Sequence, residues 1–150
     1  MSDESGDAMP RLGLPYPNPG PGGFVVGMGA DIVEVVRVQK AIERSGEHFL
    51  RRVFTEEEIA YCSAKARPFP HYAARFAAKE AVSKAFGTGI GAELSWKSMG
   101  VTHGERGQAL CVLDERARAL LHALGADSVA LTLSHTAGNA LAVALLLRRA

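Results

Sequence analysis

The sequence predicts a single α+β domain in which an antiparallel sheet packs against helices. Three observations lead to this prediction. An apolar, β-branched segment at 24–36 leads into a helix, two pairs of short apolar segments flank glycine-containing turns as β-hairpins do, and amphipathic helical segments lie between these strands. The 47% hydrophobic content supplies enough apolar side chains for one core.

The folded domain is expected to span residues 24–150. Five of the seven prolines fall within residues 1–23, which predicts a flexible leader that builds no core. The rest of the chain holds 16 basic and 13 acidic residues, a balance too even for a nucleic-acid binder. Its longest apolar run, at 140–147, is too short to span a membrane. Cys62 and Cys111 form no metal-ligand or disulfide pattern, so we expect a cytoplasmic protein.

The first elements are a buried strand and an amphipathic helix. The segment 24–36 is interrupted by glycines, and we expect Asp31 at the junction between the strand and the helix. The helix should bury one apolar face, formed by Val35, Val38 and Ile42. Roughly opposite this face lies a basic stripe made of Arg37, Lys40 and Arg44.

The middle of the chain predicts two further helices. Thr55 and Glu58 have the spacing of a capping box, which opens a short helix that reaches about Cys62. Prolines at 67–70 break the chain, and residues 71–86 then form the longest helical run, which stops at Gly87. This run is rich in alanine, which lets a neighbouring backbone approach closely.

The C-terminal half predicts two β-hairpins separated by a helix. The first hairpin pairs 96–101 with 108–113, and the second pairs 128–134 with 139–147. Between them, residues 114–124 form a short amphipathic helix that ends at Gly125.

Familiar nucleotide and hydrolase motifs are missing from the sequence. The GTGIG at 87–91 follows a helix, whereas the dinucleotide-binding fingerprint follows a strand. The sequence contains no GxxxxGK[ST], HExxH or GxSxG motif, which argues against P-loop, zincin and nucleophile-elbow chemistry.

Two carboxylates remain as candidates for chemistry. Asp31 follows the glycine-interrupted strand, and Glu80 lies in the alanine-rich helix with Lys84 one turn later. Two carboxylates with open coordination positions suit Mg²⁺, which is usually completed by water and substrate phosphates. The residues alone also allow an Asp31 that caps a helix start and a Glu80–Lys84 surface pair.

Four segments carry a specific resemblance. They are GMGADIVEVVRV at 27–38, FTEEEIAYC at 54–62, ARFAAKEAVSKAFGTGIG at 74–91 and LTLSHTAGNALAVALL at 131–146. In sequence, order and spacing they are similar to the holo-acyl-carrier-protein synthase family of phosphopantetheinyl transferases. The resemblance covers residues 24–150 and leaves the leader unexplained. It implies the fold of that family and a homotrimer with the active site between subunits.

The resemblance also implies a reaction. The family transfers the 4′-phosphopantetheine arm of coenzyme A to a serine of acyl carrier protein with Mg²⁺, releases adenosine 3′,5′-bisphosphate, and serves fatty-acid or polyketide synthesis. By motif, Asp31 and Glu80 hold the metal and Lys84 stabilises negative charge. The base for the serine proton stays open between a metal-bound water and Glu80.

Binding residues follow from the same resemblance. The residues assigned to coenzyme A are Arg75, Lys84, Gly87, Gly89, His135 and Thr136. The basic stripe is assigned to the acidic acyl carrier protein, although a solvated helix face explains it equally well. Two other functions compete: an inert module that binds coenzyme A or a carrier protein, and a metal-dependent hydrolase of coenzyme A. The expected partners are coenzyme A, the carrier protein and further copies of the chain. We do not expect binding to nucleic acid or to membranes.

Overall fold

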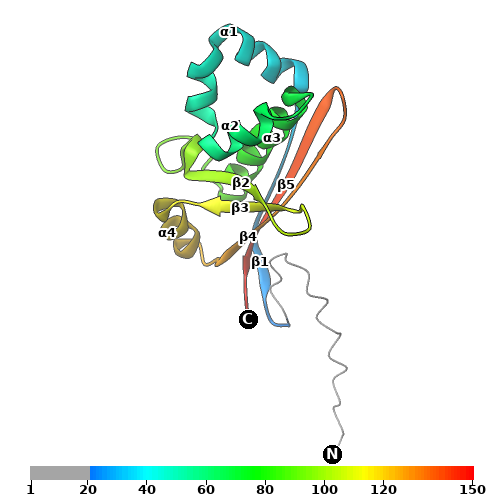
Figure 1. Cartoon of the computed structure of the whole chain (residues 1–150). Helices are drawn as coiled ribbons and strands as arrows, with labels where there is room; N and C mark the ends of the chain where they lie inside the picture. Colours follow the sequence, from blue (N-terminus) through cyan, green and yellow to red (C-terminus); the bar gives the residue numbers. More distant parts are fainter. Residues whose placement is uncertain (1–20) are drawn as a thin grey trace, which may run out of the picture.

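The structure, a computed structural model, describes residues 21–150, so nearly all of the leader expected at 1–23 lies outside the described residues (Figure 1). The predicted α+β class is confirmed. The elements in order are β1 (Phe24–Glu34), α1 (Val35–Val53), α2 (Glu56–Ser63), α3 (Pro68–Phe86), the 3₁₀ helix η1 (Trp96–Ser98), β2 (Met99–His103), β3 (Ala109–Leu113), α4 (Glu115–Ala123), β4 (Ser128–His135) and β5 (Asn139–Arg148).

The strands form two antiparallel sheets. One has the order β1-β5-β4 and the other is the β2-β3 hairpin. In the larger sheet Asp31 of β1 lies opposite Ala142 of β5, which in turn lies opposite Leu133 of β4. Helix α3 packs across one face of this sheet, where β5 presents the buried small residues Ala140, Ala142 and Ala144 (Figure 1).

Strand β1 corrects the sequence prediction in two ways. It continues to Glu34, so Asp31 lies inside the strand and not at its junction with α1. The β-branched residues after Asp31 extend the pairing with β5 by three residues. The strand is also open on one face, because Met28 and Ile32 are 69% and 67% exposed. Only the alternate positions that face α3 are covered, and the expectation of a fully buried strand is wrong.

Helix α3 starts earlier than predicted. Pro68 and Pro70 lie in its first turn, where backbone N–H groups have no partner within the helix, so the prolines cost no hydrogen bond. The proline segment therefore begins the helix and does not break the chain before it. The end of the helix agrees with the prediction, because Gly87 takes the left-handed conformation with φ 78°.

The remaining helices and the second hairpin agree with the sequence prediction, and the first hairpin is present with shifted bounds. On α1, Val35 and Val38 are buried and the basic stripe of Arg37, Lys40 and Arg44 is exposed. The first hairpin begins at Met99, later than predicted, because 96–98 form η1. The second hairpin matches the prediction to within one residue at each strand end, and Asp114 caps α4. In the described part of the chain, no helix has the length and apolar character needed to cross a membrane.

The two cysteines are free thiols. Cys62 is buried in α2, and Cys111 is partly buried in β3. Burial raises the pKa of each to about 12, so both stay protonated near neutral pH.

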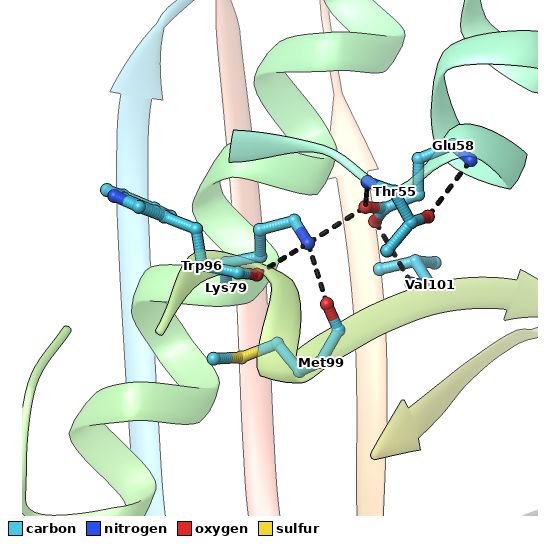
Figure 2. Close-up of polar contacts among 6 residues, drawn as sticks. All are labelled: Thr55, Glu58, Lys79, Trp96, Met99 and Val101. Atoms are coloured by element: carbon cyan, nitrogen blue, oxygen red, sulfur yellow. Dashed lines mark hydrogen bonds and ion pairs between the residues drawn. The ribbon is translucent and has the colours of Figure 1, made fainter. Parts of the chain in front are cut away.

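A fully buried ion pair connects α2, α3 and β2 (Figure 2). Lys79 Nζ lies 2.8 Å from Glu58 Oε1 and donates to the carbonyl oxygens of Trp96, at 2.9 Å, and Met99, at 2.7 Å. Glu58 accepts from the backbone N–H of Thr55, at 2.9 Å, and of Val101, at 3.0 Å. All three ammonium donors are therefore used, which is the condition under which a charge can remain buried.

We expect Lys79→Ala and Glu58→Ala each to lower the free energy of unfolding by about 3–5 kcal/mol, because each leaves the partner charge buried and uncompensated. Urea unfolding at one fixed protein concentration measures the change. The matched control is Glu56→Ala, which removes an exposed carboxylate from the same helix and should cost less than about 1 kcal/mol. Losses of that small size in both buried-pair variants would contradict this role.

Candidate active site

The site begins with a close contact between two backbones. Gly27, Gly29 and Asp31 alternate along the face of β1 that meets α3. A Cβ atom on Gly29 would lie 2.7 Å from the backbone nitrogen of Ala85 and 2.9 Å from Cβ of Lys84, closer than real Cβ atoms approach. A Cβ on Gly27 would overlap the carbonyl oxygen of Ala85. Glycine at these two positions lets α3 rest directly on the strand.

This contact brings three of the predicted site residues together. Lys84 Nζ lies 3.1 Å from Asp31 Oδ1 and donates to the carbonyl oxygen of Ala30, also at 3.1 Å. Glu80, one turn earlier on α3, has a raised pKa because it is partly buried and feels the negative charge of Asp31. The positive charges of Lys84 and Arg37 oppose this rise. The two carboxylates therefore lie close enough for the charge of Asp31 to affect the pKa of Glu80.

The donor set fits a partly coordinated Mg²⁺. Among the described residues, no group of three or more His, Cys, Asp or Glu side chains could enclose a metal ion. Asp31 and Glu80 would supply two carboxylate ligands, which is the usual protein share for Mg²⁺ that also binds substrate phosphates. The pKa of Glu80 is raised first by its partial burial and then by the negative charge of Asp31, and a bound cation would offset both effects.

A second polar group surrounds Arg75, a buried residue of α3. Its guanidinium lies 4.3 Å from the ring centre of Tyr61, and its Nη2 is 3.1 Å from Nε2 of His103. Nη1 donates to the carbonyl oxygen of His71 at 3.3 Å. The ring centres of His71 and His135 are 5.0 Å apart. These side chains line a cavity of about 300 Å³ together with residues of the β2-β3 turn and β4.

The structure divides the predicted residues between two edges of the sheet. Arg75 and His135 line the cavity beside β4, whereas Asp31, Glu80 and Lys84 meet beside β1 and are not among the residues that line it. Helix α3 contributes to both places.

The other residues assigned to coenzyme A lie in turns. The Thr136 hydroxyl accepts from the backbone N–H of Gly138, at 3.3 Å, and of Asn139, at 3.1 Å, so it also stabilises the β4-β5 turn. Gly87 and Gly89 follow α3 with φ 78° and 66°, and open space adjoins the position of each missing Cβ. A larger cavity, of about 480 Å³, lies beside α1 and α2 and contains none of the predicted site residues.

Sequence reasoning missed Tyr61, His71 and His103. His71 lies one helical turn before Arg75, a spacing visible in the sequence. His103 reaches Arg75 only because the β2-β3 hairpin folds over α3, so no local pattern could reveal it. The sequence places Lys79 at four-residue spacing from Arg75 and Ser83 on one side of the helix. It does not reveal that Lys79 is buried and paired with Glu58.

Comparison with known proteins assigns the chain to a family. A family model described as the 4′-phosphopantetheinyl transferase superfamily matches residues 27–143. The chain therefore belongs to the 4′-phosphopantetheinyl transferase superfamily.

Its relatives within that superfamily are holo-[acyl-carrier-protein] synthases. The synthase of Chlamydia trachomatis is 46% identical over 119 residues, which cover 79% of this chain and 97% of that protein. The synthase of Geobacter sp. is 42% identical over 125 residues, covering 83% of this chain and all of that protein.

Solved structures agree with the fold. The synthase of Neisseria meningitidis superposes with a TM-score of 0.77 at 31% identity and covers 82% of this chain and 98% of its own. That of Helicobacter pylori, solved in complex with coenzyme A, has a TM-score of 0.71 at 33% identity and covers 79% and 98%.

Proposed function

We propose that this chain transfers the 4′-phosphopantetheine arm of coenzyme A to a serine of apo-acyl carrier protein and releases adenosine 3′,5′-bisphosphate. The observation that carries the proposal is the convergence of Asp31, Glu80 and Lys84 beside the glycines of β1. Similarity to holo-[acyl-carrier-protein] synthases, one of them solved with coenzyme A, supports it.

The reaction is a phosphoryl transfer. The serine hydroxyl gives its proton to a base, and its oxygen forms a bond to the phosphorus of the phosphopantetheine group. The bond from that phosphorus to the leaving oxygen of adenosine 3′,5′-bisphosphate breaks. Transfers of this kind depend on positioning and charge stabilisation more than on covalent catalysis by the protein. Lys84 is suited to stabilising the leaving oxygen because its ammonium is held at the acid pair while half exposed.

Asp31 and Glu80 would hold Mg²⁺, which when bound supplies positive charge to the diphosphate. Residues of the chain itself position these groups. Asp31 orients Lys84 through their 3.1 Å contact, and the rigid contact between β1 and α3 holds both carboxylates in place. Arg75, His135, Thr136, Gly87 and Gly89 are assigned to coenzyme A, with the first two at the cavity beside β4.

A homotrimer joins the two groups of residues. The acid pair and the Arg75 cavity lie at opposite edges of one sheet, so contact between neighbouring chains would bring one group from each together. The outer face of that sheet is apolar and open, with Ile32 opposite Leu141 and Met28 opposite Leu145. An apolar patch of this kind favours association. Sedimentation equilibrium should give three times the mass of one chain, and a monomer would contradict the proposal.

The basic stripe of Arg37, Lys40 and Arg44 is proposed to bind the acidic carrier protein. The three side chains are exposed, and among the described residues none of them forms an ion pair. Arg37 is also close enough to Glu80 to lower its pKa. A carrier bound to the stripe would therefore present its serine near the acid pair. Two free cysteines are consistent with a reducing cytoplasm as the setting for fatty-acid synthesis.

Mass spectrometry of apo-carrier protein incubated with coenzyme A, Mg²⁺ and this chain tests the function. We expect the carrier to gain the mass of phosphopantetheine, and Asp31→Asn and Glu80→Gln each to remove most of this gain, since they delete ligand charge at nearly constant volume. Lys84→Ala should lose less activity than either. Binding of coenzyme A without any gain would indicate an inert binding module, and cleaved coenzyme A with an unmodified carrier would indicate a hydrolase.

We expect the double variant Arg37→Glu and Arg44→Glu to raise the KM for carrier about tenfold or more, equivalent to about 1.4 kcal/mol, with a smaller fall in kcat. The loss should shrink as salt rises, because electrostatic steering is screened. Arg52→Glu with Lys97→Glu makes the same change in charge away from the stripe and serves as the control. Steady-state kinetics at low and moderate salt provide the measurement; equal KM values for the two double variants would show that the carrier docks elsewhere.

A further inference from the structure

Three of the five histidines of this chain gather at one cavity from three different elements. His71 comes from α3, His103 from β2 and His135 from β4, and all three line the cavity beside Arg75. His103 stacks on Tyr61, with ring centres 4.4 Å apart, and Lys65 Nζ lies 4.4 Å from the same ring. Segments far apart in the sequence therefore contribute basic or titratable groups to one small volume.

The charge around this cavity is one-sided. No carboxylate is among its lining residues within the described chain. The carboxylate with an electrostatic effect on His103 is Glu57, and it accepts a hydrogen bond from the Thr102 hydroxyl at 2.8 Å. The groups that face His71 are His135, Arg75, Lys65 and His103, all of which are cationic or become so. A cavity of this composition favours an anion.

The hydrogen bond between Arg75 and His103 fixes one protonation state. Arginine is always a donor, so Nε2 of His103 must accept and its ring must be neutral. A proton on that nitrogen would end the hydrogen bond and turn both groups into donors. The buried Arg75 Nε already lacks a partner among the described residues. The site therefore holds donor capacity that the chain itself does not use.

We propose that His71 and His103 bind the 3′-phosphate of the nucleotide together with Arg75 and His135, and that each takes up a proton from solvent as the phosphate enters. This inference rests on the proposed function, because it takes the phosphate from coenzyme A or adenosine 3′,5′-bisphosphate. No bond between heavy atoms changes: an N–H bond forms on each imidazole as solvent gives up a proton, and the proton returns to solvent when the nucleotide leaves.

The direction of the pH effect follows from the free site. Burial, and the positive charges of neighbouring groups, lower the pKa of both His71 and His103, so both rings are neutral near pH 7. A phosphate monoester carries close to two negative charges there and would raise both pKa values when bound. Binding then couples to proton uptake, and nucleotide affinity rises as the pH falls.

Isothermal titration calorimetry of the full chain with adenosine 3′,5′-bisphosphate tests the inference without any catalytic turnover. Titrations from about pH 8 to about pH 6, in buffers of different ionisation heat, give both the affinity and the protons taken up. The test variant is His71→Gln with His103→Gln, since glutamine keeps a polar group without the titration. The control is His122→Gln, an exposed position on α4. Adenosine 5′-monophosphate is the probe that lacks the 3′-phosphate.

We expect the affinity of the wild type for the bisphosphate to rise over this range by about tenfold more than that of the double variant, since one linked proton changes affinity up to tenfold per pH unit. His122→Gln should behave as wild type, and the monophosphate should show little proton uptake. Wild-type proton uptake in the double variant, or equal uptake with the monophosphate, would overturn the inference and leave the proposed function intact. Absence of bisphosphate binding at every pH would instead overturn the coenzyme A assignment itself.

Discussion

The direct contact of α3 with β1 is the constraint on which the candidate site depends. Gly27 and Gly29 leave no side chain between the strand and the helix, and the buried side of the helix is rich in alanine. Backbone contact at this distance fixes both the separation and the rotation of α3. Glu80 and Lys84 then meet Asp31, although Asp31 is distant from them in sequence. Close packing of small residues thus positions the candidate site residues here.

A buried ion pair acts on another side of the same helix. Lys79 and Glu80 are neighbours in sequence, yet Lys79 joins α2 and β2 through Glu58 while Glu80 faces Arg37 and Asp31. The Lys79–Glu58 ion pair also bonds to the backbone of β2, the strand that ends at His103 in the Arg75 cavity. Helix α3 therefore places Glu80 and Lys84 beside β1 and Arg75 at the cavity beside β4. This separation suits a site completed by a neighbouring subunit.

Much of this arrangement could be predicted from sequence, and the rest could not for identifiable reasons. The capping box at Thr55, the stop at Gly87, the second hairpin and the presence of the first were predicted correctly because each depends on local chemistry. The start of the first hairpin was wrong, because residues 96–98 form η1. The assignment of Asp31 and Glu80 as metal ligands comes from the family motif and stays a prediction. Burial of Lys79 and the meeting of His103 with Arg75 depend on how the hairpin packs on α3, which no local pattern records. The open face of β1 was missed because apolar composition alone does not distinguish a core from a surface that another chain covers.

The transfer rate of Gly29→Ala tests the central claim most directly. The added methyl group would have to push α3 away from β1, and displacements of about 1 Å at a reacting centre can cost about a hundredfold in rate. Gly138→Ala adds the same methyl group in open space and is the control. We expect the Gly29 variant to keep the circular dichroism spectrum of a folded α+β domain and to lose about a hundredfold in transfer rate. The transfer rate of the Gly138 variant should stay near that of the wild type. A folded Gly29→Ala chain that transfers phosphopantetheine at the wild-type rate would contradict this claim.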